Sequence, residues 1–162
     1  MNPYGRIFTA LNKAKIQYLV VGGVAMNLHG YPRFTGDLDI LLALNEKNVE
    51  KMGALMKKMN YEKKLPVALE ELSNEGKVEE WIRNKNLTAF TFENVKEPQF
   101  NIDVIVGESL KFEKYKKHQM ILKTWNIRIP VVSIDDLIKM KRKSDRKKDA
   151  EDVAALIELK GL

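Results

Sequence analysis

Apolar residues recur along this chain with two periods, one typical of helices and one typical of strands. Ile7, Phe8 and Leu11 lie at helical spacing within residues 4–15, which predicts an opening helix. Residues 18–21 form a short apolar run, which predicts a buried strand. The same criteria predict helices over residues 24–29 and 48–59, and strands over residues 38–42, 87–92, 100–106 and 129–132.

The middle of the chain is less regular. Residues 65–84 have apolar positions that suit a helix, but Gly76 falls inside the pattern and is expected to break it. The two strands that follow, residues 87–92 and 100–106, are separated by a short polar stretch. We expect them to pair as a hairpin through residues 93–98.

The last third of the chain begins with a helix-start pattern. Ser133 is followed three residues later by Asp136, and apolar residues come next. The helix that opens here is predicted to continue into the charged residues 139–152. Runs of charge of this kind are usually a solvated helix face.

The order of these elements predicts an α/β (α+β) fold, with helices packed against a mixed β-sheet. No compositional break divides the 162 residues, and this length is enough to bury one core. We therefore expect a single domain over residues 1–162, with its core at about 16–132 and a carboxy-terminal helical part at about 133–162.

A pair of glycines, Gly22 and Gly23, separates the first predicted strand from the helix after it. Glycine lets backbone amides approach a ligand closely, and the following helix presents its amino end to an anion. The pair therefore favours a phosphate-binding turn, with a turn that only packs helix on strand as the alternative. Neither the GxxxxGK[ST] loop nor the GxGxxG fingerprint is present.

Asp37 and Asp39 stand at the mouth of the next predicted strand. Side chains two apart on a strand project from the same face, so these carboxylates are expected roughly 6 to 7 Å apart. Two such anions repel, and a hard divalent cation between them reverses the sign of that interaction. Mg²⁺ suits one or two carboxylates completed by substrate phosphate oxygens. The alternative is a solvated turn with acidic residues.

The glycine pair, the spacer and Asp37-x-Asp39 resemble the motif of the DNA polymerase beta-like nucleotidyltransferase superfamily. The R-x-T-x-D-h-D-h form, where h is apolar, begins here at Arg33 and Thr35 and is similar to that of small bacterial nucleotidyltransferases. These include the abortive-infection toxin group (AbiEii and MenT-like) and aminoglycoside or lincosamide nucleotidyltransferase-like proteins. The resemblance extends over about residues 18–156.

The resemblance implies a third metal-binding carboxylate on a later strand, and Asp103 supplies it. It is the one acid in the predicted strand 100–106, where an unpartnered charge between apolar neighbours is costly. An edge-strand aspartate facing water is the alternative. Three aspartates, Asp37, Asp39 and Asp103, would hold two Mg²⁺ ions, with Mn²⁺ as a substitute.

Asp149 and Asp152 interrupt the apolar stripe of the last predicted helix. Both share a side with Leu156, and Lys141 shares a side with Leu137 in the same way. Polar groups aligned with an apolar stripe suggest the wall of a site or buried pairing, and simple exposure is the alternative.

The toxin-type enzymes also carry a lysine and then a K-D-x-x-D pattern in their late helices. Lys141 and the run from Lys148 match this pattern. The resemblance implies that both lysines contact nucleotide phosphates and that the two aspartates of the pattern orient them. Lys143 and Arg146 are alternatives to Lys141, because the intervening segment is compact in this chain.

The activity implied is attack by an acceptor hydroxyl on the α-phosphate of a nucleoside triphosphate, with release of pyrophosphate. Gly22 and Gly23 would seat the β- and γ-phosphates, and Arg33, Thr35 and Lys141 would be supporting contacts. Positioning and charge neutralisation would provide most of the acceleration. The resemblance thus implies a nucleotidyltransferase.

Composition limits where the protein acts. Cysteine is absent, which removes disulfides, thiolate metal sites and cysteine nucleophiles. No apolar run approaches the roughly 20 residues that cross a bilayer, and the start of the chain has no signal-peptide pattern. We expect a cytoplasmic protein without a membrane partner.

The acceptor is the least determined part of the hypothesis. The 28 basic and 22 acidic side chains give a net charge of +6, concentrated in residues 111–123 and 139–148. This favours RNA, and the toxin resemblance favours a tRNA end. Phe112, Tyr115 and Trp125 could stack on bases or pack in the core. The alternatives are transfer to a small molecule or a protein, or an inactive nucleotide-binding or antitoxin module; a cognate antitoxin is a further expected partner.

Overall fold

The computed structural model describes residues 2–107, 110–143 and 147–161, with the backbone alone at 147 and 148. Within these ranges one seven-stranded sheet has the order β3-β4-β5-β2-β1-β7-β6. Its strands are β1 (Tyr18–Val21), β2 (Leu38–Leu42), β3 (Tyr61–Lys63), β4 (Ala89–Asn94), β5 (Ile102–Ile105), β6 (Met120–Thr124) and β7 (Ile127–Val131). The α/β class and the mixed sheet predicted from sequence are confirmed.

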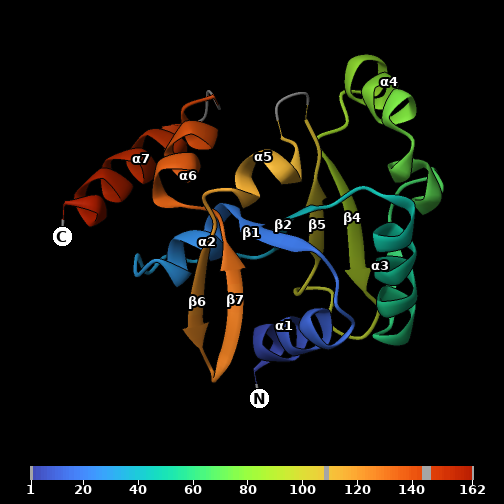
Figure 1. The fold of residues 1–162 in the computed structure, drawn as a ribbon, viewed down its shortest axis with the longest axis horizontal. Coiled ribbons are helices and arrows are strands. Elements are labelled where there is room, and N and C mark those ends of the chain that lie inside the picture. Colours follow the sequence, from blue (N-terminus) through green and yellow to red (C-terminus); the bar gives the residue numbers. More distant parts are fainter. Residues whose placement is uncertain (1, 108–109, 144–146, 162) are drawn as a thin grey trace.

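Helices lie against this sheet and at both of its ends (Figure 1). They are α1 (Pro3–Lys13), α2 (Gly22–Leu28), α3 (Glu46–Lys58), the 3₁₀ helix η1 (Leu69–Ser73), α4 (Glu75–Lys85), α5 (Phe112–Lys116), α6 (Ile134–Arg142) and α7 (Lys147–Lys160). α3 and α4 lie beside the β3–β4 end of the sheet, whereas α6 and α7 pack together at the other end (Figure 1). No helix within the described ranges is long and apolar enough to cross a membrane.

Strand direction in the centre of the sheet determines which residues meet. β1 is antiparallel to β2 and parallel to β7, and β2 is parallel to β5. All four residues of β1 are buried, as are four of the five residues of β2, as is typical of central strands that are covered on both faces. The acid-bearing ends of β2 and β5 therefore lie next to each other on a rigid support.

Several helices begin at polar caps that the sequence contains. The side chain of Ser133 accepts a hydrogen bond from the Asp136 backbone N–H at 3.1 Å, as the helix-start pattern predicted. Asn2, Asn45 and Asn74 cap α1, α3 and α4 in the same way. The predicted hairpin is also confirmed, because β4 and β5 pair antiparallel with Phe90 opposite Val104.

Two helix predictions differ from the structure. The expected break within residues 65–84 is present, between η1 and α4, but it falls at Asn74, not at Gly76. Asn74 has extended backbone angles and caps α4, so the chain changes direction one residue before the helix that contains Gly76. The helix predicted to run through residue 152 ends instead at Arg142, and a second helix begins at Lys147.

Candidate active site

Asp39 and Asp103 are neighbours across the parallel strands β2 and β5. Their Cα atoms are register partners, as are those of Leu38 with Ile102 and Ile40 with Val104. Paired residues in adjacent strands project from the same face of a sheet. Asp39 and Asp103 are half-buried, whereas the apolar residues on either side of them are buried. The fold thus brings two carboxylates from distant parts of the chain to one place.

Asp37 lies in the bend just before β2 and interacts with the same group. Its pKa is raised, first because of partial burial, then because of the charge of Asp103 and a side-chain hydrogen bond with it; Lys64 opposes this shift. Asp103 is itself oriented by Thr91 on β4, whose hydroxyl donates a 2.6 Å hydrogen bond to Asp103 Oδ1. Three acidic side chains are therefore electrostatically coupled or adjacent at the β2–β5 mouth.

Gly22 faces these carboxylates at the start of α2. It has φ +68°, and a Cβ placed on it would lie 2.3 Å from Asp39 Oδ2. Both the backbone conformation and the space thus require glycine. A Cβ on Gly23 would lie 2.8 Å from the hydroxyl oxygen of Thr35 and 3.9 Å from Arg33 Nε. The glycine turn therefore contacts the paired acids on one side and the R-x-T segment on the other.

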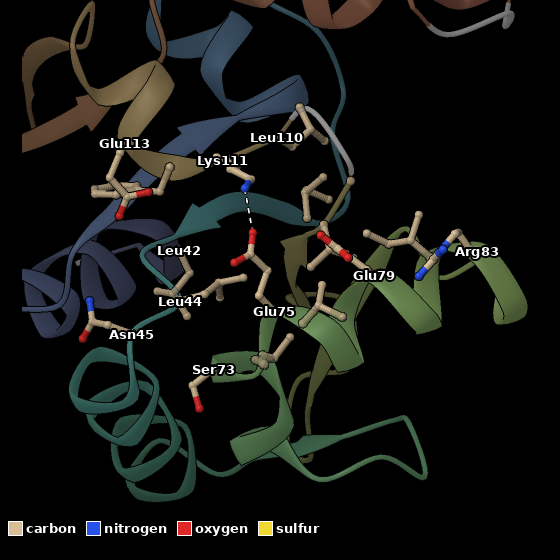
Figure 2. A pocket seen from close by; sticks show the side chains of 17 residues that line it. Leu42, Leu44, Asn45, Ser73, Glu75, Glu79, Arg83, Leu110, Lys111 and Glu113 are labelled. Atoms are coloured by element: carbon tan, nitrogen blue, oxygen red, sulfur yellow. Dashed lines mark hydrogen bonds and ion pairs between the residues drawn. The ribbon is translucent and has the colours of Figure 1, made fainter.

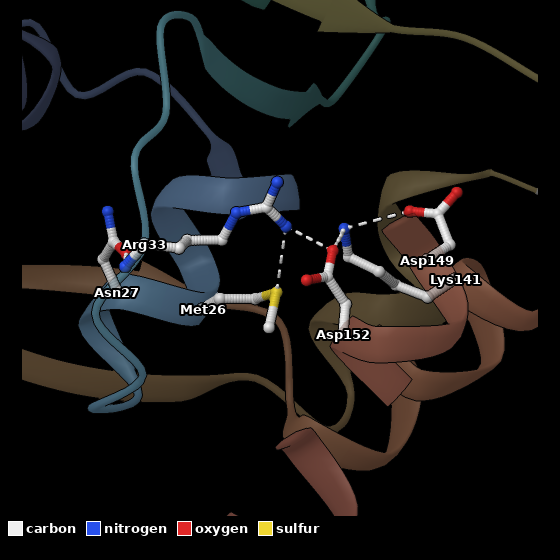
Figure 3. A network of polar contacts seen from close by, with 6 residues as sticks. All are labelled: Met26, Asn27, Arg33, Lys141, Asp149 and Asp152. Carbon is white, nitrogen blue, oxygen red and sulfur yellow. Dashed lines mark hydrogen bonds and ion pairs between the residues drawn. The ribbon is translucent and has the colours of Figure 1, made fainter. Parts of the chain in front are cut away.

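Arg33 also belongs to a buried polar network with the last two helices (Figure 3). Its Nη1 donates to Asp152 Oδ2 on α7, and the same oxygen accepts from Lys141 Nζ of α6 at 2.8 Å. Lys141 Nζ also lies 3.4 Å from Asp149 Oδ1. The four side chains are between 3% and 13% exposed. We call Arg33, Lys141, Asp149 and Asp152 the Arg33 network.

The network depends on the interruption between α6 and α7. In one continuous helix, residues 141 and 152 would be about 16 Å apart along the axis. Because α6 ends at Arg142 and a separate helix begins at Lys147, Lys141 instead contacts both aspartates of α7. Asp149 and Asp152 are 2% and 4% exposed, so the prediction that they pack inward is confirmed. The predicted contact of Lys148 with nucleotide falls on a side chain outside the described residues.

The acid cluster suits a divalent cation. Asp37 and Asp103 repel each other at partly exposed positions, and a cation would remove that repulsion. Asn101 Oδ1, two residues before Asp103, is a buried acceptor without a hydrogen-bond partner in the described part of the chain. Among the described residues, no group of three or more histidine, cysteine, aspartate or glutamate side chains is arranged to hold a metal ion. Mg²⁺ sites that bind substrate phosphates rarely are complete, since water and phosphate oxygens fill the shell.

Three side chains near these acids were missed in the sequence. Thr91 follows from the hairpin register, which places it opposite Asp103. Tyr4 donates to the Thr35 carbonyl at 3.4 Å, and its pKa is raised by burial and by Asp37. Phe34 lies between Arg33 and Thr35 and is 90% exposed, although large apolar residues are usually covered. The exposed Phe34 has no signal in the sequence beyond its place in the motif.

Other aromatic residues pack instead of facing a ligand. Phe112 and Tyr115, which could have stacked on bases, are 6% and 3% exposed and belong to the core. Trp125 is 44% exposed and stacks on Phe8, with ring centroids 6.4 Å apart. Packing is therefore the outcome for Phe112 and Tyr115.

A separate cavity of about 670 Å³ lies at the opposite ends of β2 and β5 (Figure 2). Leu42 and Ile105, the last residues of these strands, contribute to its lining, and none of the three candidate aspartates does. Glu75 and Lys111 form a 2.7 Å ion pair beside it. The acid cluster and this cavity are thus distinct regions of the molecule.

Solved structures with this fold are nucleotidyltransferases. A predicted nucleotidyltransferase from Thermotoga maritima has a TM-score of 0.57 at 16% identity, covering 96% of this chain and 90% of its own. The lincosamide antibiotic adenylyltransferase LnuA, lincomycin-bound, has a TM-score of 0.62 at 13% identity, and the match covers 96% of this chain and 95% of LnuA. ANT(2″)-Ia in complex with adenylyl-2″-tobramycin has a TM-score of 0.58 at 11% identity, and the match covers 94% of this chain and 84% of ANT(2″)-Ia. At these identities the likeness establishes the fold, which is that of a nucleotidyltransferase.

The sequence defines the class further. The profile of the family described as "Nucleotidyl transferase AbiEii toxin, Type IV TA system" matches residues 6–161, which is nearly the whole chain. A comparison with curated proteins found no match. The chain belongs to the AbiEii nucleotidyltransferase toxin family, and it is a nucleotidyltransferase.

Proposed function

We propose that this enzyme transfers a nucleoside monophosphate from a nucleoside triphosphate to an acceptor hydroxyl, in a metal-dependent reaction. The acceptor oxygen attacks the α-phosphorus, the bond from that phosphorus to the β-bridging oxygen breaks, and pyrophosphate leaves. The observation that supports this most is the register of Asp39 with Asp103, beside Asp37 and opposite Gly22.

Asp37, Asp39 and Asp103 would hold Mg²⁺, as two ions, or Mn²⁺ in its place. A bound divalent cation neutralises phosphate charge and favours deprotonation of the attacking hydroxyl. The backbone at Gly22 and Gly23 would seat the β- and γ-phosphates, because side chains there would fill the space next to the acids. These residues position the triphosphate for in-line attack.

The Arg33 network would fix the other side of the nucleotide. Arg33 and Thr35 adjoin the glycine turn, and Asp152, which also accepts from Lys141, holds Arg33 in place. Lys141 and Lys148 would contribute positive charge near the phosphates, with Asp149 and Asp152 orienting them. A preorganised cationic group of this kind acts without reorganisation during the reaction.

RNA is the acceptor that we favour, and a tRNA end in particular. The net charge of +6 and the toxin family support an acceptor that is a polyanion essential to the cell. Phe34, three residues before Asp37 in the sequence, offers an exposed ring on which a nucleobase can stack. Action on nucleotides and RNA would place the enzyme in the cytoplasm, where a cognate antitoxin would oppose it.

The test is incubation of the protein with α-labelled nucleoside triphosphates, magnesium and total RNA. Asp39→Asn removes one acid of the cluster, and Asp135→Asn is the matched control because Asp135 is an exposed acid of α6. We expect label in RNA with the wild type and the control, and a rate lower by about 10³-fold with Asp39→Asn.

Each other result identifies an alternative. Label on a small molecule or on protein would show that this molecule, and not RNA, is the acceptor. Nucleotide binding without transfer would indicate an inactive module. Undiminished transfer by Asp39→Asn would contradict the assignment of the acid cluster.

A further inference from the structure

A hollow of about 370 Å³ lies between α5 and α6. Tyr115, the one aromatic residue of its lining, is buried in the core at 3% exposed. We call this hollow the basic groove. Its polar lining consists of Lys114, His118, Asp136, Lys139, Arg142 and Lys143.

The charge of the basic groove is strongly positive. Four of its residues are lysine or arginine, and Asp136 is its one acid. Asp136 is 5% exposed and lies 3.1 Å from His118 Nδ1 and 4.0 Å from Lys139 Nζ. Lys139 itself has a side chain that is 71% exposed. The acid is therefore buried beneath basic side chains that face solvent.

The spacing along α6 separates the basic groove from the Arg33 network. At 3.6 residues per turn, Lys139, Arg142 and Lys143 lie within about 100° of one another around the helix, whereas Lys141 points about 200° away from Lys139. Lys141 contacts the acids of α7 at 2.8 and 3.4 Å. One helix thus presents basic side chains to the groove on one side and Lys141 to the network on the other.

We propose that the basic groove binds the phosphodiester backbone of the RNA acceptor, away from the reacting atoms. Affinity for nucleic acid comes largely from lysine and arginine on phosphates, with release of counterions. Because α6 also carries Lys141, RNA in the groove would be held on the element that borders the nucleotide site. This inference rests on the proposed RNA acceptor and assigns that acceptor a place on the surface.

An acidic protein is the other class of partner that charge alone would allow. Stable protein interfaces have a core of aromatic or apolar anchors that become desolvated. Tyr115 is already covered by the protein's own core, and the rest of the groove lining is charged or histidine. Because its described lining contains no aliphatic residue and no ring other than those of Tyr115 and His118, the groove suits repeated phosphates better than a protein surface.

The experiment compares two double variants with the same change in charge. Lys139→Gln/Arg142→Gln neutralises the groove, and Lys57→Gln/Lys58→Gln neutralises two exposed lysines of α3 at the far end of the sheet. All four side chains are exposed, so both variants should fold, which circular dichroism checks. Binding of unfractionated tRNA is measured at several salt concentrations without nucleotide.

We expect the groove variant to bind tRNA about tenfold more weakly at moderate salt, with a salt slope smaller by about 1.4 for two lost contacts. The α3 variant should bind as the wild type does. Equal affinity of the two variants for tRNA would overturn the proposal, even if the groove then bound an acidic protein.

A separate readout distinguishes this inference from the proposed function. Transfer of label to tRNA is measured with the same proteins, since the binding assay needs no catalysis. Loss of tRNA binding in the groove variant, with no label transferred by the wild type, would support the groove and reject RNA as acceptor. If the groove variant transfers label fully and binds tRNA as tightly as the wild type, the groove is not the RNA-binding surface, and tRNA remains the acceptor.

Discussion

Aspartates occupy two regions of this enzyme that differ in burial and in the charge of their neighbours. Asp149 and Asp152 are almost fully buried, and Arg33 and Lys141 balance their charge. Asp37 and Asp103 lie at a more open mouth of the sheet, where the charge of Asp103 contributes to the raised pKa of Asp37. The charges of the Arg33 network are paired within the protein, whereas the acid cluster brings like charges together.

The difference separates buried carboxylates that are paired with cationic side chains from more exposed carboxylates that repel each other. Breaking a buried ion pair leaves its partner charge unpaired, which costs stability. Removing one of two carboxylates that repel each other relieves a cost instead. The same type of substitution should therefore change stability with opposite sign in the two regions.

The largest effect is expected in the Arg33 network. Asp152→Asn leaves Arg33 and Lys141 short of a buried counter-charge, and should lower the free energy of unfolding by about 3–5 kcal/mol. Thermal unfolding should show a melting temperature lower by about 10 °C. Asp135→Asn, which breaks the exposed pair with Lys160, is the control and should change little. An Asp152→Asn protein as stable as the wild type would contradict the claim that the Arg33 network stabilises the fold.

A smaller effect, on binding alone, is expected at Phe34, which lies on the loop between the two regions. Phe34→Ala removes a ring that is 90% exposed, so the melting temperature should not change. If the ring stacks on a base, its loss should weaken binding of nucleotide or acceptor by about 1–3 kcal/mol. Steady-state kinetics with each substrate varied in turn would identify which KM rises. Unchanged KM values for both substrates would show that Phe34 does not contact either of them.

The smallest effect is expected at Asp37, and its sign is opposite to that at Asp152. The pKa of Asp37 is raised in the folded protein, so its stabilising contribution is complete below the ordinary value of 3.8 and is lost as pH rises through the folded pKa. At neutral pH, Asp37→Asn should therefore stabilise the protein, by less than about 1 kcal/mol because the site is partly exposed.

Unfolding in denaturant across a range of pH would test this sign. The advantage of Asp37→Asn over the wild type should disappear as pH falls below 3.8. Asp135 has a lowered pKa because of Lys160, so Asp135→Asn should show no gain at neutral pH. A loss of stability in Asp37→Asn at neutral pH would mean that the two regions do not differ in the way described.

Sequence predicted the acid cluster better than it predicted the network. Asp103 is exceptional as a charge in an apolar strand, and Asp39 lies beside it in the parallel pairing of β2 with β5. Asp37 lies in the bend before β2, so the strand period used in the prediction does not apply to it. The inward position of Asp149 and Asp152 also followed from helical spacing. Their pairing with Arg33 did not, because it joins residues 119 apart and depends on a turn after Arg142 that no glycine or proline marks.

The sheet edges were missed for a related reason. β3 has three residues and one buried side chain, and β6 is largely exposed, so neither has the alternation that predicts a strand. Both form because a neighbouring strand offers unpaired backbone groups, as β7 does along all of β6. Hydrogen bonding between strands, which a single sequence does not reveal, determines these elements.

Binding of nucleotide with magnesium tests the acid cluster most directly. A nucleoside triphosphate analogue that resists transfer is titrated into wild type, Asp103→Asn and Asp135→Asn, with and without Mg²⁺, and thermal stability is followed. The wild type and Asp135→Asn should gain about 2.7 kcal/mol at one hundred times the dissociation constant, only with Mg²⁺, and Asp103→Asn should gain far less. Equal stabilisation of Asp103→Asn, or stabilisation without a divalent cation, would contradict the site.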